Sequence, residues 1–374
     1  MKKIILFAGI FAYILTACSD KNAFTLTGTF ATGDMDGKIV YLKELDSNFR
    51  LSGTIDSVKV ENGKFVFEGI SKEIPVVQFV LIDESAMPAT FIIEKGKIEM
   101  NFDSELKATV KGTPMNEQYQ LFETEKANMF EKIFAANDKY TELKEAGNLT
   151  SEQFREFDKT SKQLFEELNI IVYNYIKPNI MTQVGQYFLG GSNSFYLNDS
   201  QLKELISLTT PDFRSIKAIQ KWEKQIEARE ATGVGKQFTD IKGFDLNGKE
   251  VSLSDYTGKE KVVLIDFWAS WCGPCVRAIP DLVTIYQRYK NQGFEIVGIS
   301  LDSDKESWAR ATGELKIPWP QFSNLKGWEE DGAIAYGVNG IPQIILIDKE
   351  GIIIERELRA DALKFKLEEL LGSK

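Results

Sequence analysis

The sequence predicts an α/β domain at the C-terminal end of the chain, preceded by a small antiparallel β-sandwich and a helical segment. Three patterns support this prediction. Short stretches of alternating apolar and polar residues fill the region 24–112, and apolar residues recur at helical spacing in 113–230. Strand and helix patterns then alternate through 231–374, as in a sheet covered by helices on both faces.

The first 23 residues have the pattern of an export signal. A positively charged start precedes an apolar run over residues 4–15, shorter than the roughly 20 residues that a membrane-spanning helix needs. The run ends in Leu-Thr-Ala-Cys at 15–18, which resembles the lipobox of bacterial lipoproteins. The resemblance implies that 1–17 is a signal peptide, that 18–23 is a linker, and that Cys18 carries the lipid. Acyl chains at Cys18 would anchor the protein to the inner or outer membrane, on the periplasmic side of the cell envelope. The alternative is a buried apolar helix with a chance cysteine.

The region 24–112 carries the signals of short strands joined by turns. Phe24–Gly28, Lys38–Leu42 and Lys64–Glu68 alternate apolar and polar residues. Asn62-Gly63 stands between the alternating stretches Ser57–Val60 and Lys64–Glu68 and predicts a hairpin turn. No group of residues with evident chemistry stands out in this region.

The region 113–230 is helical by its apolar spacing. Its aromatic stripes would form ordinary helix core or line a ligand groove, and the spacing does not decide between the two. The last helix is expected at Asp212–Glu230. The glycine-rich stretch Ala231–Gly235 is predicted to be a linker.

The amino-acid composition excludes several kinds of catalytic, metal-binding and nucleic-acid-binding site. The chain has no histidine, so Ser-His-Asp and Cys-His nucleophiles and histidine-ligated metals are excluded. Its net charge of −10 offers no broad basic surface for nucleic acid. Three cysteines cannot build a disulfide framework. We therefore expect no metal, no cofactor and no nucleic-acid partner.

The other two cysteines form the motif Cys272-Gly273-Pro274-Cys275, which follows a buried apolar strand and begins a helix. A thiol that caps a helix N-terminus is stabilised as a thiolate by free N–H groups and the helix dipole. Pro274 suits the first turn, where its missing N–H costs nothing. Cys272 is expected to be the exposed nucleophile and Cys275 the more buried resolving thiol. A zinc half-site would need about four ligands, and the chain has no second cysteine pair; a structural disulfide is the other alternative.

The stretch Asp266–Cys275 resembles the thioredoxin active-site signature, and Gly340-Ile341-Pro342 resembles its cis-proline loop. Asp266 lies within an apolar strand, where burial would raise its pKa; a strand-end cap is the alternative reading. The resemblance implies that Asp266 accepts the proton of the resolving cysteine. It also implies a cis bond before Pro342 and a substrate strand paired to the backbone of Ile341. Trp271 is expected to shield the cysteine pair, and with Gly273 and Pro274 to contact substrate.

Residues 236–374 resemble the TlpA-like and ResA-like thiol-disulfide oxidoreductases, a thioredoxin family of membrane-anchored proteins with roles in cytochrome maturation. The region 24–112 resembles the β-domain of unknown function that precedes such domains in lipoproteins of the Bacteroidetes. The resemblance implies a reductase of disulfides in exported proteins, supplied with electrons by a membrane thiol donor. Many members have a glutamate three residues after the second cysteine, where this chain has Ala278.

Two other functions remain open at the level of sequence. One is a peroxiredoxin-like antioxidant activity, since the two families share a scaffold; the chain lacks the spacing of a peroxidatic site. The other is a ligand- or partner-binding lipoprotein in which the redox centre is auxiliary.

Overall fold

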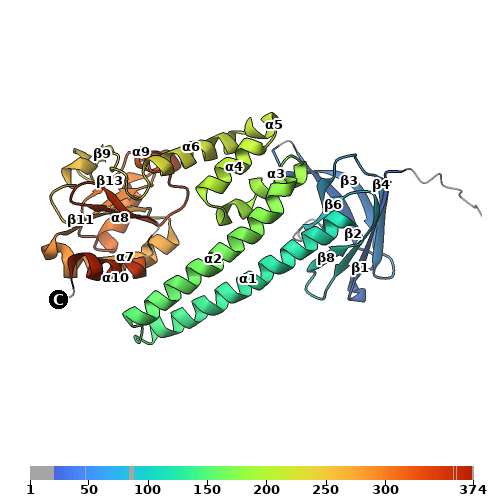
Figure 1. Ribbon diagram of the computed structural model, residues 1–374, viewed down its shortest axis with the longest axis horizontal. Coiled ribbons are helices and arrows are strands. Elements are labelled where there is room, and N and C mark those ends of the chain that lie inside the picture. The colour runs from blue at the N-terminus through green and yellow to red at the C-terminus, as the bar shows by residue number, and fades with distance from the viewer. Residues whose placement is uncertain (1–20, 47, 84–87, 357, 359, 373–374) are drawn as a thin grey trace, which may run out of the picture. The chain divides into compact units, whose positions relative to one another are not determined.

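The computed structural model describes residues 21–372 except 47, 84–87, 357 and 359 (Figure 1). Contacts group the chain into two compact units. The first unit comprises the residues up to Ala135 together with Lys162–Thr210, and the second comprises Ala136–Ser161 together with Pro211 onward. The long helices α1 (Pro114–Glu145) and α2 (Ser151–Asn179) contribute residues to both units.

Cys18 and the lipobox lie outside the described residues, so the prediction of a lipid anchor stays a prediction. Within the part of the chain that the structure describes, no helix is both long and apolar enough to span a bilayer.

The first unit begins with two four-stranded sheets that share one apolar core, which includes Leu26, Val40, Phe91 and Ile98. Their orders are β4-β1-β7-β8 and β3-β2-β5-β6. The prediction of a small β-domain is confirmed, but β1 pairs with β7 in parallel, so one sheet is mixed rather than antiparallel. The strands are β1 (Ala23–Phe30), β2 (Ile39–Leu45), β3 (Leu51–Lys59), β4 (Lys64–Ile70), β5 (Val76–Ile82), β6 (Ala89–Ile93), β7 (Gly96–Phe102) and β8 (Ala108–Lys111).

The hairpin turn predicted at Asn62-Gly63 forms, with Glu61 and Lys64 paired across it, but the pairing does not extend into the flanking strands. Asn62 and Gly63 both have positive φ, 51° and 68°, and their N–H groups donate to the carboxylate of Asp36 at 3.1 and 2.6 Å. However, β3 pairs with β2 and β4 pairs with β1, so the turn carries the chain from one sheet to the other.

Helices α1 and α2 bury or half-bury most residues of the predicted aromatic stripes. Phe122 stacks on Tyr175 with ring centroids 4.2 Å apart, and Leu168 is fully buried. Phe134 and Phe165 are the exceptions, at 62% and 45% exposed. The stripe therefore serves mainly as helix core. The unit ends with α3 (Gln183–Gly190) and α4 (Asp199–Leu208).

The second unit is built on a five-stranded sheet of order β13-β12-β11-β14-β15. All seven residues of the central strand β11 are buried; β11 runs parallel to β12 and antiparallel to β14. Burial on both faces explains its near-continuous apolar sequence. The strands of this unit are β9 (Lys242–Phe244), β10 (Glu250–Ser252), β11 (Val262–Trp268), β12 (Phe294–Ser300), β13 (Gln321–Phe322), β14 (Gln343–Asp348) and β15 (Ile353–Arg356). Its helices are α5 (Pro211–Arg214), α6 (Lys217–Ala231), α7 (Gly273–Tyr289), α8 (Lys305–Glu314), α9 (Asp331–Ala335) and α10 (Ala360–Leu371).

The stretch Ala231–Gly235 is packed into this unit rather than free. Thr232 is fully buried, and its backbone and side-chain oxygens accept hydrogen bonds from Arg356 at 2.5 and 2.7 Å. Gly235 donates its N–H to the carbonyl of Ile353. The predicted helix 212–230 is also interrupted, between α5 and α6.

Candidate active site

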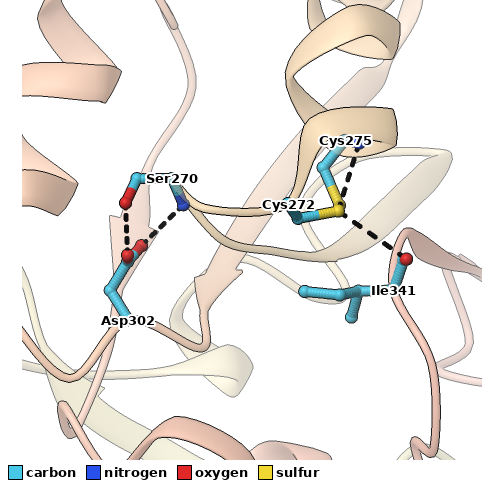
Figure 2. The surroundings of a disulfide bond; sticks show 5 residues. All are labelled: Ser270, Cys272, Cys275, Asp302 and Ile341. Atoms are coloured by element: carbon cyan, nitrogen blue, oxygen red, sulfur yellow. Dashed lines mark hydrogen bonds between the residues drawn. A yellow bond between two sulfur atoms is a disulfide. The ribbon is translucent and has the colours of Figure 1, made fainter. Parts of the chain in front are cut away.

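The two cysteines lie where strand β11 passes into helix α7, and in this structure they are joined as a disulfide (Figure 2). Cys272 is the N-cap of α7, and its Sγ accepts the backbone N–H of Cys275 at 3.2 Å. Gly273 and Pro274 form the first helical turn. The sulfur therefore takes up one of the N–H groups that a helix start leaves free, and a thiolate at the same position would gain more from that contact.

Cys272 and Cys275 are both buried in the disulfide, at 5% and 2% exposed. The expectation of an exposed nucleophile is therefore wrong for this oxidised state, although Cys275 is the deeper of the two. Cys272 Sγ lies 3.7 Å from the carbonyl oxygen of Ile341 (Figure 2). The Ile341–Pro342 bond is cis, as the resemblance implies. The cis-proline loop thus lies directly against the nucleophilic sulfur.

Asp266 provides a buried carboxyl group behind the cysteines. It is 2% exposed, and burial raises its pKa to about 7. Asp266 pairs with Gly298 on one side and Ile344 on the other, with two further strand residues after it, so the strand-end cap reading is wrong. Asp266 and Cys275 line the same pocket, so the carboxyl group faces the space beside the resolving cysteine, as the predicted role of proton acceptor requires.

The loop before Cys272 is held by a residue that sequence reasoning missed. The carboxylate of Asp302 accepts the N–H of Ser270 at 3.0 Å and its hydroxyl at 2.5 Å (Figure 2). Asp302 also accepts the hydroxyl of Ser300 at 2.7 Å and is 1% exposed. The only signal in the sequence was the position of Asp302 just after an apolar strand, at the edge where the motif also begins.

Trp271 is 54% exposed and forms an aromatic pair with Trp328, whose ring centroid lies 6.0 Å away. Trp328 was not predicted to belong to the site. Because Trp271 directly precedes Cys272, the pair gives the surface beside the cysteines an apolar, aromatic character.

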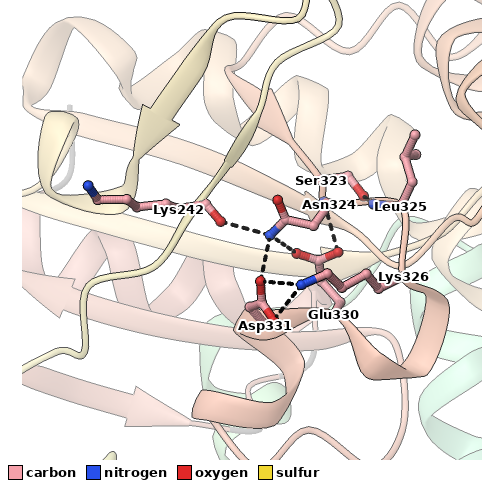
Figure 3. Close-up of polar contacts among 7 residues, drawn as sticks. All are labelled: Lys242, Ser323, Asn324, Leu325, Lys326, Glu330 and Asp331. Carbon is pink, nitrogen blue, oxygen red and sulfur yellow. Dashed lines mark hydrogen bonds and ion pairs between the residues drawn. The ribbon is translucent and has the colours of Figure 1, made fainter.

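The segment that carries Trp328 is fixed by a polar network around Glu330 (Figure 3). Glu330 is fully buried and accepts the backbone N–H and the side-chain amide of Asn324 at 2.9 and 3.0 Å. Burial raises the pKa of Glu330. An ion pair of 2.8 Å between Lys326 and Asp331 ties the two ends of the segment together. The position of Trp328 is thereby set by the fold.

A pocket of about 820 Å³ opens beside the disulfide. Cys275, Ala278 and the cis-proline loop are among the residues that line it. Asp266 and Asp281 are the two acidic side chains in the lining that the structure describes. Lys144 of helix α1 also lines this pocket.

Two family models match the chain. The AhpC/TSA family matches residues 234–356, and a domain of unknown function, DUF4369, matches residues 24–119. The second match agrees with the β-domain resemblance drawn from the sequence.

Curated relatives and solved structures cover the C-terminal part. Thiol-disulfide oxidoreductase ResA of Bacillus thuringiensis subsp. konkukian is 31% identical over 138 residues, which are 37% of this chain and 76% of that protein. ResA of Geobacillus kaustophilus is 35% identical over 121 residues, 32% of this chain and 67% of that protein. The thioredoxin domain of a thiol-disulfide oxidoreductase from Bacteroides vulgatus is 39% identical, covering 37% of this chain and 98% of that one at a TM-score of 0.35. A thiol-disulfide oxidoreductase from Bacteroides fragilis is 33% identical over 36% of this chain and all of the other, also at 0.35.

The AhpC/TSA match spans the strand, the helix-capping cysteine and the cis-proline loop, and the ResA relatives are at least 30% identical to this chain over more than two thirds of their own length. The chain therefore belongs to the thioredoxin-like thiol-disulfide oxidoreductases of the ResA type.

Proposed function

We propose that this protein reduces disulfide bonds of exported proteins in the cell envelope, in protein folding or cytochrome c maturation. The observation that carries the proposal is the contact between Cys272 Sγ and the carbonyl oxygen of Ile341, 3.7 Å apart. A substrate strand paired to the backbone at Ile341 would present its own disulfide to Cys272.

The reaction begins with the dithiol form. The Cys272 thiolate attacks one sulfur of the substrate disulfide, the substrate S–S bond breaks, and the other substrate sulfur leaves as a thiolate that takes up a proton. Cys275 then attacks Cys272 Sγ and releases the second substrate thiol. The two electrons that reduce the substrate come from the dithiol, which ends as the Cys272–Cys275 disulfide seen in this structure.

Asp266 is the group that takes the proton of Cys275 in the second step. A carboxyl with a pKa of about 7 is divided between its acid and base forms near neutral pH, which suits a group that must accept and later return a proton. Reduction of the disulfide by a membrane thiol donor reverses these steps, and Asp266 then gives the proton back.

The location in the cell envelope rests on the lipobox that ends at Cys18. A lipid at Cys18 would keep the redox centre at the membrane, close to its electron donor. Replacement of Cys18 by Ser should release the protein into the periplasmic soluble fraction, and unchanged membrane association would contradict the anchor.

Trapping with Cys275→Ser tests the function. Without the resolving thiol, Cys272 should remain attached to its clients, which non-reducing gels and mass spectrometry of the cell envelope would identify. Cys272→Ser is the matched control and should trap none. If Cys275→Ser yields no mixed disulfide from the envelope, the proposal fails.

A further inference from the structure

A groove of about 310 Å³ lies between helix α6 and the segment that carries Trp328. One wall is formed by Lys217, Lys221 and Lys224, which lie three or four residues apart and so share one face of α6. Trp328 and Ile334 lie on the opposite wall. All five residues belong to the second unit, the same compact unit as the cysteines.

An apolar surface leads from the nucleophilic cysteine to this groove. Trp328 lines the groove, and its ring centroid lies 6.0 Å from that of Trp271, the residue before Cys272. Trp271, Trp328 and Ile334 are 54%, 41% and 51% exposed. Large apolar side chains that are exposed next to one another are typical of a binding surface. A client segment attached at Cys272 can therefore cross the two tryptophans and enter the groove.

The lysines of the groove outnumber the carboxylates that line it. Glu329 is the one carboxylate in the described lining, and it lies 3.1 Å from the Nζ of Lys221. Lys217 and Lys224 are exposed, and among the residues that the structure describes neither has an ion pair or a side-chain hydrogen bond. The groove therefore offers two cations that are free to bind a carboxylate.

The carboxylates that follow Trp328 in the chain are occupied elsewhere (Figure 3). Glu330 is fully buried and accepts hydrogen bonds from Asn324, and Asp331 is paired with Lys326 at 2.8 Å. The chain as a whole carries a net charge of −10. An acidic segment is thus repelled by the protein as a whole and attracted by this groove, so charge also orients it.

We propose that this groove is a docking site for the client polypeptide, and that it selects client segments in which apolar and acidic side chains flank the cysteine. Trp271 and Trp328 contact the apolar side chains, and Lys217 and Lys224 pair with the carboxylates. The inference rests on the proposed reductase function, whose substrate class it narrows. Helix α6 ends at Ala231, before the AhpC/TSA match begins at residue 234, so the helical region contributes to substrate choice.

The test uses two synthetic peptides, each a disulfide-linked dimer, with Leu beside the cysteine and three further residues on each side that are Glu in one peptide and Lys in the other. Each rate constant with the fully reduced protein is divided by that with dithiothreitol, which corrects for the intrinsic reactivity of the peptide disulfide. The Glu peptide should then be reduced faster than the Lys peptide. Lys224→Glu should lower the ratio of the two corrected constants about threefold or more, which is roughly 0.7 kcal/mol.

Trp328→Ala tests the apolar part of the surface. It should slow both peptides by a similar factor relative to bis(2-hydroxyethyl) disulfide, a small uncharged probe. Unchanged peptide rates in this variant would mean that the client does not cross the two tryptophans, and would overturn the proposal.

Lys249→Glu is the matched control, because Lys249 is an exposed lysine of the second unit that does not line the groove. It makes the same change in net charge as Lys224→Glu and should leave the ratio unaltered. An equal effect of the two variants would assign the preference to net charge and overturn the proposal. Equal corrected rates for both peptides in the wild type would also overturn it while leaving the reductase function intact. Failure to reduce even the uncharged probe would instead count against the reductase function.

Discussion

The carboxylate of Asp302 accepts both the N–H and the hydroxyl of Ser270, two residues before the nucleophilic cysteine. This pair joins the loop after β11 to the loop after β12. Because Asp302 is buried, its loss would leave the donors of Ser270 and Ser300 without their acceptor.

Replacement of Asp302 by Ala should therefore lower the free energy of unfolding of the second unit by about 2–3 kcal/mol. Denaturant unfolding of the oxidised protein, followed by tryptophan fluorescence, would measure the loss. Lys326→Ala, which removes a half-exposed ion pair with Asp331, is the control and should cost less than about 1 kcal/mol. Equal losses in the two variants would mean that Asp302 does not hold the loop.

Asp266 should make stability depend on pH. Its pKa is about 7 in the folded chain against an ordinary value of 3.8, so between these values the folded chain holds a proton that the unfolded chain has lost. The free energy of unfolding should fall by roughly 4 kcal/mol from pH 4 to about pH 8, at 1.36 kcal/mol per pKa unit, and this contribution should be flat above about pH 8.

Asp266→Asn removes this contribution. The difference in unfolding free energy between variant and wild type should grow in favour of the variant from pH 4 to pH 7. Parallel pH profiles for the two proteins would show that Asp266 does not titrate in this range.

The Cys272–Cys275 couple should be reducing. A Gly-Pro pair between the cysteines resembles reducing thioredoxins, so we expect a potential nearer to about −270 mV than to about −120 mV. Redox titration against glutathione buffers, read by thiol alkylation, would measure it. A value at the oxidising end would reverse the proposed direction of electron flow.

Peroxide consumption separates the antioxidant alternative from the reductase. Cys275→Ser leaves Cys272 as the single thiol of the motif, and we expect it to consume hydrogen peroxide no faster than an ordinary exposed thiol. Fast catalytic consumption of peroxide by this variant, absent from Cys272→Ser, would favour the peroxiredoxin-like function.

Phe154→Ala should detach the tip of the α1–α2 hairpin, residues 136–161, from helix α10, because Phe154 stacks on Phe365 of that helix with ring centroids 4.4 Å apart. Phe154 is 7% exposed, and truncation of a buried phenylalanine costs about 3–5 kcal/mol. Hydrogen exchange of the backbone amides in 136–161 should accelerate strongly. Phe165→Ala, at a position 45% exposed on the same helix, should leave exchange there nearly unchanged. Similar exchange in both variants would show that this aromatic stacking does not hold the tip.

The motif could be predicted from sequence because its parts are contiguous: a buried strand, a helix-capping cysteine and a proline in the first turn lie within Asp266–Cys275. The cis-proline loop was found only through resemblance. Asp302, Trp328 and Lys144 were missed because each reaches the site through tertiary packing, from segments whose local patterns indicate only a strand end, a loop and a solvated helix. The periodicity of apolar residues in a sequence does not show which distant segments pack against one another.

The β-domain shows the same limit. Asn62-Gly63 has the local chemistry of a tight turn and forms one, but local chemistry does not say which strands pair across it. That choice depends on which faces are apolar in strands far apart in the chain, and it places β1 beside β7 in parallel.

The attachment of the hairpin tip to α10 also decides where the chain can be cut. A fragment that begins at residue 231 keeps both cysteines, Asp266 and Pro342. It would reduce small disulfides in an assay as the full-length protein does. It would nevertheless lack Lys144 and leave Phe365 without the aromatic partner that covers it. Such a fragment would expose a new apolar patch around Phe365 that is prone to self-association.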